Sequence, residues 1–382
     1  MKTLRNFRFV AFVIVLLATD VVMVSTSFAG GDNYSPRLVG MGRAFTASSR
    51  GLDAVGVNPA NLALDDRNAT VTLNLIPLGL SAGSDFINLK IYNDFFTGIP
   101  DPVNPEKRIP KFLTEDDKDK LLELFPGGVA RTQFKFESAP IGLSLQIGNF
   151  GFALVPSVQS SFSLDLEKEY LELPLRGFPA NKEYTLDKTA VNGQAVAEVN
   201  ASFAYILPFV LPMVSDISVG LGIKYLQGLA FAATDHYNGT IKTYANNINP
   251  YGEDFPDSTV VDLNFLQWVA AMNPDDPQPV GSGMGYDIGI VATIMNHIQF
   301  GASITNIGSI KWDKNTKAII GRSHMALTAP ASNKAEQDQF KDAFKGETVD
   351  TTGFEFDLPT AINIGVAVQL DDIFEWMPFR WL

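Results

Sequence analysis

The sequence contains no cysteine and three histidines among its 382 residues. Without cysteine there is no disulfide framework and no thiolate chemistry. The histidines are His236, His297 and His324, and their positions match neither the ligand spacing of a zinc site nor a Ser–His arrangement. We therefore predict that the protein is not an enzyme and holds no metal and no cofactor.

Positive charge is also scarce. Lysine and arginine together number 29 against 42 aspartate and glutamate residues, and the formal net charge is -13. A nucleic-acid partner requires a basic surface that neutralises phosphates. The composition therefore argues against nucleic acid as a partner.

Long apolar runs are missing after the N-terminus. Residues 9–24 form an apolar run after a basic start, and Ser27-Phe28-Ala29 follows as a small-x-small cleavage site, so residues 1–29 read as a signal peptide. The alternative is a membrane anchor, although Asp20 interrupts the run. No later segment approaches the ~18 apolar residues of a spanning helix. We therefore expect an exported protein.

What the sequence has in abundance is alternation with period two, the pattern of a strand with unlike faces. Residues 217–225 are one example, in which apolar side chains alternate with serine, glycine and lysine. One face is thus apolar and the other is small or polar. We predict eight such strands, near residues 69–81, 131–147, 150–164, 194–206, 216–227, 285–295, 298–310 and 358–370.

The connections between these strands favour one class of all-β protein. A soluble sandwich would also alternate, but here long and short connections take strict turns. Long external loops and short periplasmic turns are typical of an outer-membrane barrel. We therefore predict that residues 67–382 form a transmembrane antiparallel β-barrel in the bacterial outer membrane, in contact with its lipid. The expected long loops are 82–130, 165–193, 228–284 and 311–357.

Residues 30–66 differ from the rest because they are rich in small residues and lack strand alternation. Glycine permits close backbone approach, and Asn-Pro favours a local bend. We predict a compact plug, or hatch, folded inside the barrel. Its motif residues are Gly40, Met41, Gly42, Phe45, Asn58, Pro59 and Ala60.

Two of the long loops carry helical patterns. Thr114 to Asp117 reads as a capping box that opens a helix ending near Pro126. Residues 263–272 show an apolar helical stripe. Both helices could pack as a lid over the barrel mouth, or the second could capture an apolar ligand. The capture candidates are Phe265, Leu266, Trp268, Val269 and Met272.

Pro156 lies in the middle of the third predicted strand, where proline ordinarily costs a ladder hydrogen bond. One interpretation is a local bulge without a role. The other is a lateral opening in the wall through which an apolar solute leaves.

The pairing of Gly40-Met-Gly-Arg-Ala-Phe45 with Asn58-Pro-Ala60, ahead of a barrel, resembles the FadL/OMPP1/TodX superfamily of outer-membrane proteins. The same motif is similar to that of PorV-type barrels of the type IX secretion pathway. The first resemblance implies a fourteen-stranded barrel with a hatch in its lumen. It also implies that apolar ligands are caught at the outer loops and leave sideways through the wall. The motif covers roughly a tenth of the chain, and the family's ligand contacts do not carry over to residues of this sequence.

The strand count departs from that family. An eight-stranded barrel has an interior just wide enough for its own side chains, so a plug of about thirty residues would not fit. Either further strands lie within 228–284, or the closing strands are missing, which is the interpretation we favour.

These patterns lead to three functional hypotheses. The first is a transporter that passes hydrophobic small molecules, of the fatty acid or hydrocarbon class, past the hatch by passive diffusion. The alternative is a PorV-like binding barrel with a secreted protein partner. A structural barrel with a permanent plug is the third.

Overall fold

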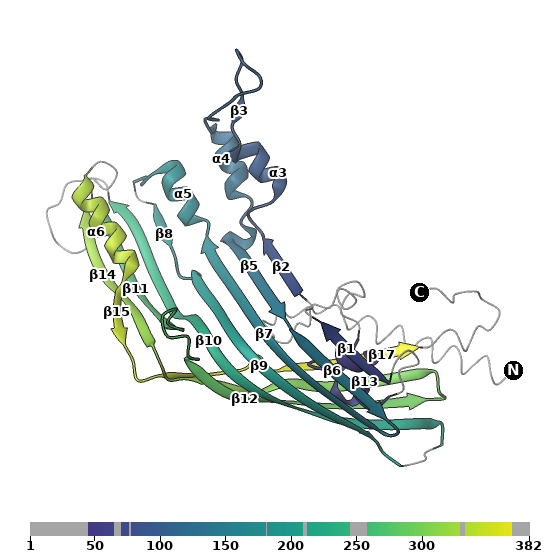
Figure 1. Ribbon diagram of the computed structural model, residues 1–382. Helices are drawn as coiled ribbons and strands as arrows, with labels where there is room; N and C mark the ends of the chain where they lie inside the picture. The colour runs from purple at the N-terminus through teal and green to yellow at the C-terminus, as the bar shows by residue number, and fades with distance from the viewer. Residues whose placement is uncertain are drawn as a thin grey trace.

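The computed structural model describes residues 45–64, 70–75, 78–180, 182–208, 212–244, 258–328 and 333–368. The predicted signal peptide and the plug residues Gly40, Met41 and Gly42 lie outside these ranges. The described chain is dominated by one antiparallel sheet of fifteen strands, which is strongly curved (Figure 1). A separate two-stranded sheet joins β3 (Ile99–Pro100) to β4 (Arg108–Ile109).

The strands of the large sheet range from three to 31 residues. They are β1 (Val71–Leu75), β2 (Leu78–Ser84), β5 (Val129–Ser138), β6 (Ile141–Ile147), β7 (Phe150–Glu167), β8 (Glu183–Thr185), β9 (Ala190–Ile206), β10 (Val214–Tyr244), β11 (Ser258–Ala271), β12 (Gly281–Ile294), β13 (Ile298–Trp312), β14 (Thr316–Leu327), β15 (Glu347–Asp350), β16 (Phe354–Asp357) and β17 (Ala361–Val368).

Strand pairing divides this sheet into two tiers. The first half of β10 pairs with β12 and its second half with β11, while β7 pairs first with β6 and then with β5. We call β1, β6, β12, β13, β16 and β17, with the adjoining parts of β7, β9 and β10, the lower tier. The upper tier consists of β2, β5, β8, β11, β14 and β15 with the remaining parts of β7, β9 and β10. Among the described residues, β1 and β17 each pair on one side only, so these strands do not form a closed ring.

The predicted strands are found, but the stretches 69–81 and 131–147, each predicted as one strand, are two strands apiece, β1 and β2, and β5 and β6. The tiers explain why the strands were undercounted. The two stretches predicted as long loops, 228–284 and 311–357, contain the second half of β10 and all of β11 and β14. The prediction of a helix over 263–272 is wrong, because these residues belong to β11 up to Ala271. Leu263 and Phe265 are buried on one face of β11 and Ala270 on the other, and a strand covered on both faces loses its alternation.

The helices are short and lie in the connections. α4 (Glu115–Leu122) begins with the predicted capping box, in which Thr114 and Asp117 bond reciprocally to each other's backbone N–H groups. α3 (Leu89–Ile91) and a π-helical turn, η4 (Tyr92–Phe96), precede it, and η5 (Pro126–Gly128) follows. α5 (Glu169–Arg176) and α6 (Lys334–Lys345) were not predicted. Within the described ranges, no helix is both long enough and apolar enough to cross a membrane.

The lower tier has two unlike faces. On β17, Ile362 and Ile364 are 73% and 79% exposed, whereas Asn363 and Gly365 between them are half-buried and face inward. The same alternation runs through the neighbouring strands. Further exposed apolar residues on these strands are Val71, Leu73, Leu75, Ile141, Phe150, Leu154, Phe203, Val219, Leu221, Tyr225, Ile288, Ile290, Phe300 and Ile304.

Candidate functional site

The inner face of the lower tier holds the N-terminal segment, residues 45–64. This segment folds as two 3-10 helices, η2 (Gly51–Ala54) and η3 (Pro59–Ala63). Pro59 opens η3, and the side chain of Asn58 caps it by accepting a hydrogen bond from the N–H of Ala60 at 3.2 Å. The predicted motif residues Phe45, Asn58, Pro59 and Ala60 are all buried here.

Glycine forms the surface that receives this segment. A β-carbon at Gly220 would lie 2.2 Å from the backbone nitrogen of Ala60, and one at Gly151 would lie 2.2 Å from the backbone of Leu62. The segment therefore packs at backbone contact distance, which only glycine allows at these positions. We call the six inward glycines that contact the segment, one from each of six strands, the glycine belt. They are Gly142, Gly151, Gly220, Gly289, Gly301 and Gly365.

Hydrogen bonds fix the segment to β10 and to β13, which lie on either side of β12. Ser218 of β10 donates to the carbonyl oxygen of Ala60, and Ser303 of β13 donates to that of Val57, both at 2.6 Å. Asn58 donates from Nδ2 to the carbonyl oxygen of Thr46 at 2.9 Å. Because these buried polar groups have partners, removing one partner would leave the other unsatisfied.

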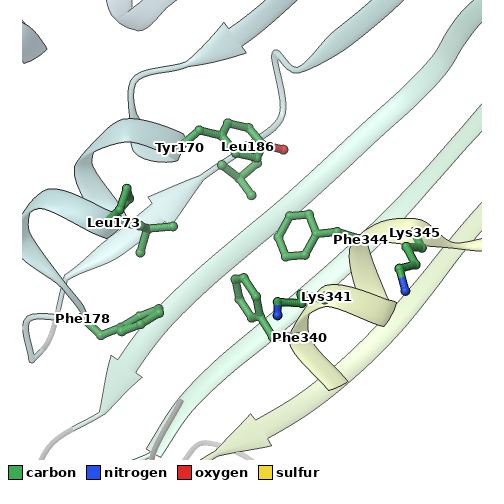
Figure 2. Close-up of a pocket in the computed structure, with 9 residues that line it drawn as sticks. Tyr170, Leu173, Phe178, Leu186, Phe340, Lys341, Phe344 and Lys345 are labelled. Carbon is green, nitrogen blue, oxygen red and sulfur yellow. The ribbon is translucent and has the colours of Figure 1, made fainter. Parts of the chain in front are cut away.

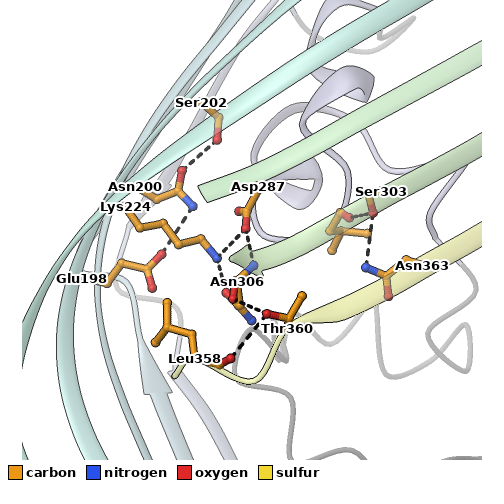
Figure 3. Close-up of polar contacts among 11 residues, drawn as sticks. Glu198, Asn200, Ser202, Lys224, Asp287, Ser303, Asn306, Leu358, Thr360 and Asn363 are labelled. Atoms are coloured by element: carbon orange, nitrogen blue, oxygen red, sulfur yellow. Dashed lines mark hydrogen bonds and ion pairs between the residues drawn. The ribbon is translucent and has the colours of Figure 1, made fainter. Parts of the chain in front are cut away.

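A buried polar cluster lies beside the glycine belt on the same face (Figure 3). Lys224 of β10 and Asp287 of β12 form an ion pair with Nζ and Oδ1 3.0 Å apart. Lys224 is four residues from the belt glycine Gly220, and Asp287 is two residues from Gly289. The Asn306 backbone N–H donates to the same carboxylate at 2.8 Å, and Lys224 donates to Oδ1 of Asn306 at 2.5 Å. The ion pair is almost fully buried, which requires this close pairing.

Aromatic side chains follow further along the inner face. The ring of Phe231 lies 5.0 Å from that of Trp312 and 4.5 Å from that of Phe356, measured between centroids. Trp268 contacts Phe354 at 5.5 Å, and Met272 packs against the same cluster. Two of the predicted capture residues, Trp268 and Met272, therefore belong to the interior.

Strand β7 changes its pairing partner at Pro156. β7 pairs with β6 as far as Leu154 and with β5 from Val158 onward, so residues 155–157 have no ladder partner on that side. Proline fits here because it has no N–H to donate. The register with β9 continues through Pro156 to Val199 without a shift, so the structure has no bulge at this residue. A cavity of about 240 Å³ lies at this junction, lined in part by Pro140, Pro156, Val199 and Tyr225.

A larger apolar cavity lies between α5 and α6 (Figure 2). Its volume is about 620 Å³, within the range of small-molecule pockets. Its floor continues into a buried cluster that contains the predicted capture residue Phe265. The lining residues are Tyr170, Leu173, Pro174, Phe178, Leu186, Phe340, Lys341, Phe344 and Lys345.

Alternation along β11 gives the face on which this cavity lies. Ala270 packs with Leu226 and Trp312 on the inner face, and Phe265, five residues away, therefore points outward. The cavity between α5 and α6 is thus on the outer face of the upper tier. The other two predicted capture residues, Leu266 and Val269, are half-buried within β11.

Buried hydroxyl and carboxyl groups lie under the cavity. The Tyr170 hydroxyl donates to the Tyr237 hydroxyl at 3.1 Å, and burial raises the pKa of the Tyr170 phenol. Burial also raises the pKa of the Glu167 carboxyl, although this group accepts a hydrogen bond from the Lys188 N–H at 2.9 Å. Burial therefore favours the protonated, uncharged form of these groups more than water does.

The sequence contains a weak signal for this cavity. Phe340 and Phe344 are four residues apart on α6, and Tyr170 and Leu173 are three apart on α5, which places each pair on one helical face. Nothing in the sequence brings the two helices together, because about 165 residues separate them. No cluster of three or more histidine and acidic side chains suited to a metal ion occurs in the described part of the chain.

Comparison with known proteins places the chain in one family. No curated protein and no solved structure matches it. A family model matches residues 59–379, from η3 of the N-terminal segment to beyond β17. The match covers the described strands of the sheet and the end of the segment that the sheet holds. The chain therefore belongs to the family described as "Family of unknown function (DUF5723)".

Proposed function

We propose that the protein is an outer-membrane β-barrel that passes hydrophobic small molecules, of the fatty acid or hydrocarbon class, by passive diffusion. The observation that carries this proposal is the pair of unlike faces of the lower tier. Large apolar side chains such as Ile362 and Ile364 are exposed on its outer face, whereas glycine and polar residues cover its inner face. A water-soluble protein rarely exposes such a continuous apolar surface, and lipid-facing strands require it.

In this proposal residues 45–64 act as the hatch. The segment is seated on the glycine belt and bonded to β10 and β13, so it closes the lower end of the barrel. The buried Lys224–Asp287 pair next to it adds a polar layer that an apolar solute would not cross. A solute would therefore leave sideways.

The α5–α6 cavity would capture the ligand, and the wall junction at Pro156 would be the exit. The cavity is apolar and lies on the same face as the lipid-facing residues. Residues 155–157 lack ladder bonds on one side, which makes this the weakest described point in the wall around β7.

Two experiments test the proposal. Cell fractionation should recover the mature protein in the outer membrane, soluble only with detergent. Liposomes that contain the purified protein should take up a fluorescent fatty acid and an aromatic hydrocarbon faster than empty liposomes. A freely soluble mature protein, or equal uptake by the two sets of liposomes, would contradict it.

One observation favours the PorV-like alternative, in which the barrel binds an exported protein and the hatch stays shut. The hatch packs against all six glycines of the belt, and it meets Gly151, Gly220 and Gly301 at backbone contact distance, which leaves little freedom for displacement. Copurification distinguishes the two functions: lipid or hydrocarbon bound to the isolated protein supports transport, and a bound exported protein supports the alternative.

A further inference from the structure

A second cavity lies on the opposite face of the upper tier from the α5–α6 cavity. Its volume is about 630 Å³, and its lining residues are His236, Leu263, Asn264, Arg322, Ser323 and His324. Asn264 adjoins Phe265 on β11, and neighbouring residues of a strand point to opposite faces. Because Phe265 faces outward, the Asn264 side chain lies on the inner face of the upper tier. The proposed route for hydrophobic molecules does not use this face in the upper tier.

Strand register gathers the polar side chains of this cavity. Asn264 of β11 is directly opposite Arg322 of β14, and Asp262 is directly opposite His324. Residues opposite each other in an antiparallel pair have β-carbons about 4.5–5.5 Å apart. Alternation places all four side chains on one face, so they form a compact block.

The block offers donors that the protein itself leaves unused. Within the described ranges, neither the Arg322 guanidinium nor the Asn264 amide has a hydrogen-bond or ion-pair partner. Oδ2 of Asp235 is hydrogen-bonded to Nδ1 of His236 at 2.9 Å, so the Nε2 edge of that ring points away from the carboxylate. Asp262 holds Nδ1 of His324 in the same way. Two of the three histidines in the chain are thus oriented in one cavity.

The chemistry of these groups selects a class of ligand. A guanidinium presents parallel N–H groups that match an oxyanion, and the Asn264 amide can both donate and accept. The Asn264 amide oxygen accepts hydrogen bonds and suits hydroxyl groups. We propose that this cavity binds a hydrophilic ligand with one oxyanion and neighbouring hydroxyls, which is the chemistry of an acidic sugar.

The experiment measures glucuronate binding to the full-length protein in detergent by isothermal titration calorimetry, with glucose as the uncharged comparison. Glucuronate should bind more tightly than glucose. Arg322→Gln should weaken glucuronate binding by ~10-fold or more, because it removes a charge-assisted pair. Asn264→Ala should weaken it less.

Lys317→Gln is the matched control. Lys317 is on the same strand as Arg322, five residues away and therefore on the opposite face, and it is exposed. The Lys317 variant should bind glucuronate as the parent protein does. The Arg322 and Lys317 variants should both keep the unfolding temperature of the parent. No binding by the parent, equal affinity for glucose, or equal weakening in the Arg322 and Lys317 variants would overturn the proposal.

Discussion

A β-carbon at Gly289 would lie 2.0 Å from Oδ1 of Asn58. This position on β12 therefore admits the N-terminal segment because it carries no side chain. The same relationship recurs around the glycine belt. At these positions the missing side chains leave the space that residues 45–64 occupy.

Gly289→Val should displace the segment. The new side chain would overlap Asn58 and Pro59, and overpacking of this kind costs ~1–3 kcal/mol or more. We expect a lower unfolding temperature in detergent and faster proteolysis within residues 45–64. Gly83→Val on β2 is the control, since nothing lies within 4 Å of its β-carbon position. Equal stability of both variants would show that the belt does not hold the segment.

Asn58→Ala should destabilise the protein more than loss of an ordinary helix cap. The side chain is fully buried, caps η3 and donates to Thr46, so its removal leaves buried groups unsatisfied at a cost of ~1–3 kcal/mol. Asn333→Ala removes an exposed cap of α6 and should cost ~1 kcal/mol or less. Denaturant titration of both variants gives the comparison, and a larger effect at Asn333 would refute it.

Lys224→Met should cost ~3–5 kcal/mol, because it leaves the Asp287 carboxylate buried without its counter-ion. The double variant Lys224→Met/Asp287→Leu should recover most of the loss, since apolar replacements of both partners are often neutral. Unfolding free energies of the two single variants and the double variant complete the cycle. If the losses simply add, the two side chains are not energetically coupled.

Pro156→Val tests the lateral exit. Valine removes the proline ring from the point where the ladder of β7 changes from β6 to β5, and it adds an N–H where there is no ladder partner on that side. Uptake of an apolar fluorophore by liposomes should therefore differ from that of the parent, while the unfolding temperature stays the same or falls. Leu221→Ile, at an exposed outward position of β10 outside this cavity, is the control. Unchanged uptake by the proline variant would remove Pro156 from the route.

Glu167→Gln tests the effect of burial on a carboxyl group of the upper tier. Burial raises the pKa of Glu167 above its usual value of 4.5. As the pH rises from 4.5 through the raised pKa, the unfolded state loses its proton first, so the glutamate lowers the stability of the folded state. Glutamine does not ionise, so the Glu167→Gln variant does not lose stability in this way.

The glutamine variant should therefore match the parent at pH 4 and be more stable than the parent at pH 7.5. Thermal unfolding at the two values measures the difference. A variant that is less stable than the parent at pH 7.5 would show that the hydrogen bond from the Lys188 N–H needs a charged acceptor.

The sequence predicts the lower tier well because its two faces meet different environments. Ile362 and Ile364 alternate with Asn363 and Gly365, and that contrast is visible without a structure. The upper tier lacks the contrast. β11 is covered on both faces at Phe265 and Ala270, so its apolar run resembles a helical stripe as much as a strand.

The candidate sites divide in the same way. Asn58 and the belt glycines stand out in the sequence, and Pro156 is conspicuous inside a strand. The partners of these residues depend on register over hundreds of positions, such as the bond from Ser303 to Val57 across 246 residues. Local patterns carry no information on such pairings. For the same reason the α5–α6 cavity could not be predicted.

The position of residues 45–64 also sets an order of assembly. Thr46 contacts Gly365 of β17, although it precedes that glycine by more than three hundred residues along the chain. The part of the protein that is made early thus finds its last described neighbour only when nearly all of the strands have been made. Until then its apolar surface is only partly covered, so we expect folding to be slow and to be helped by a chaperone.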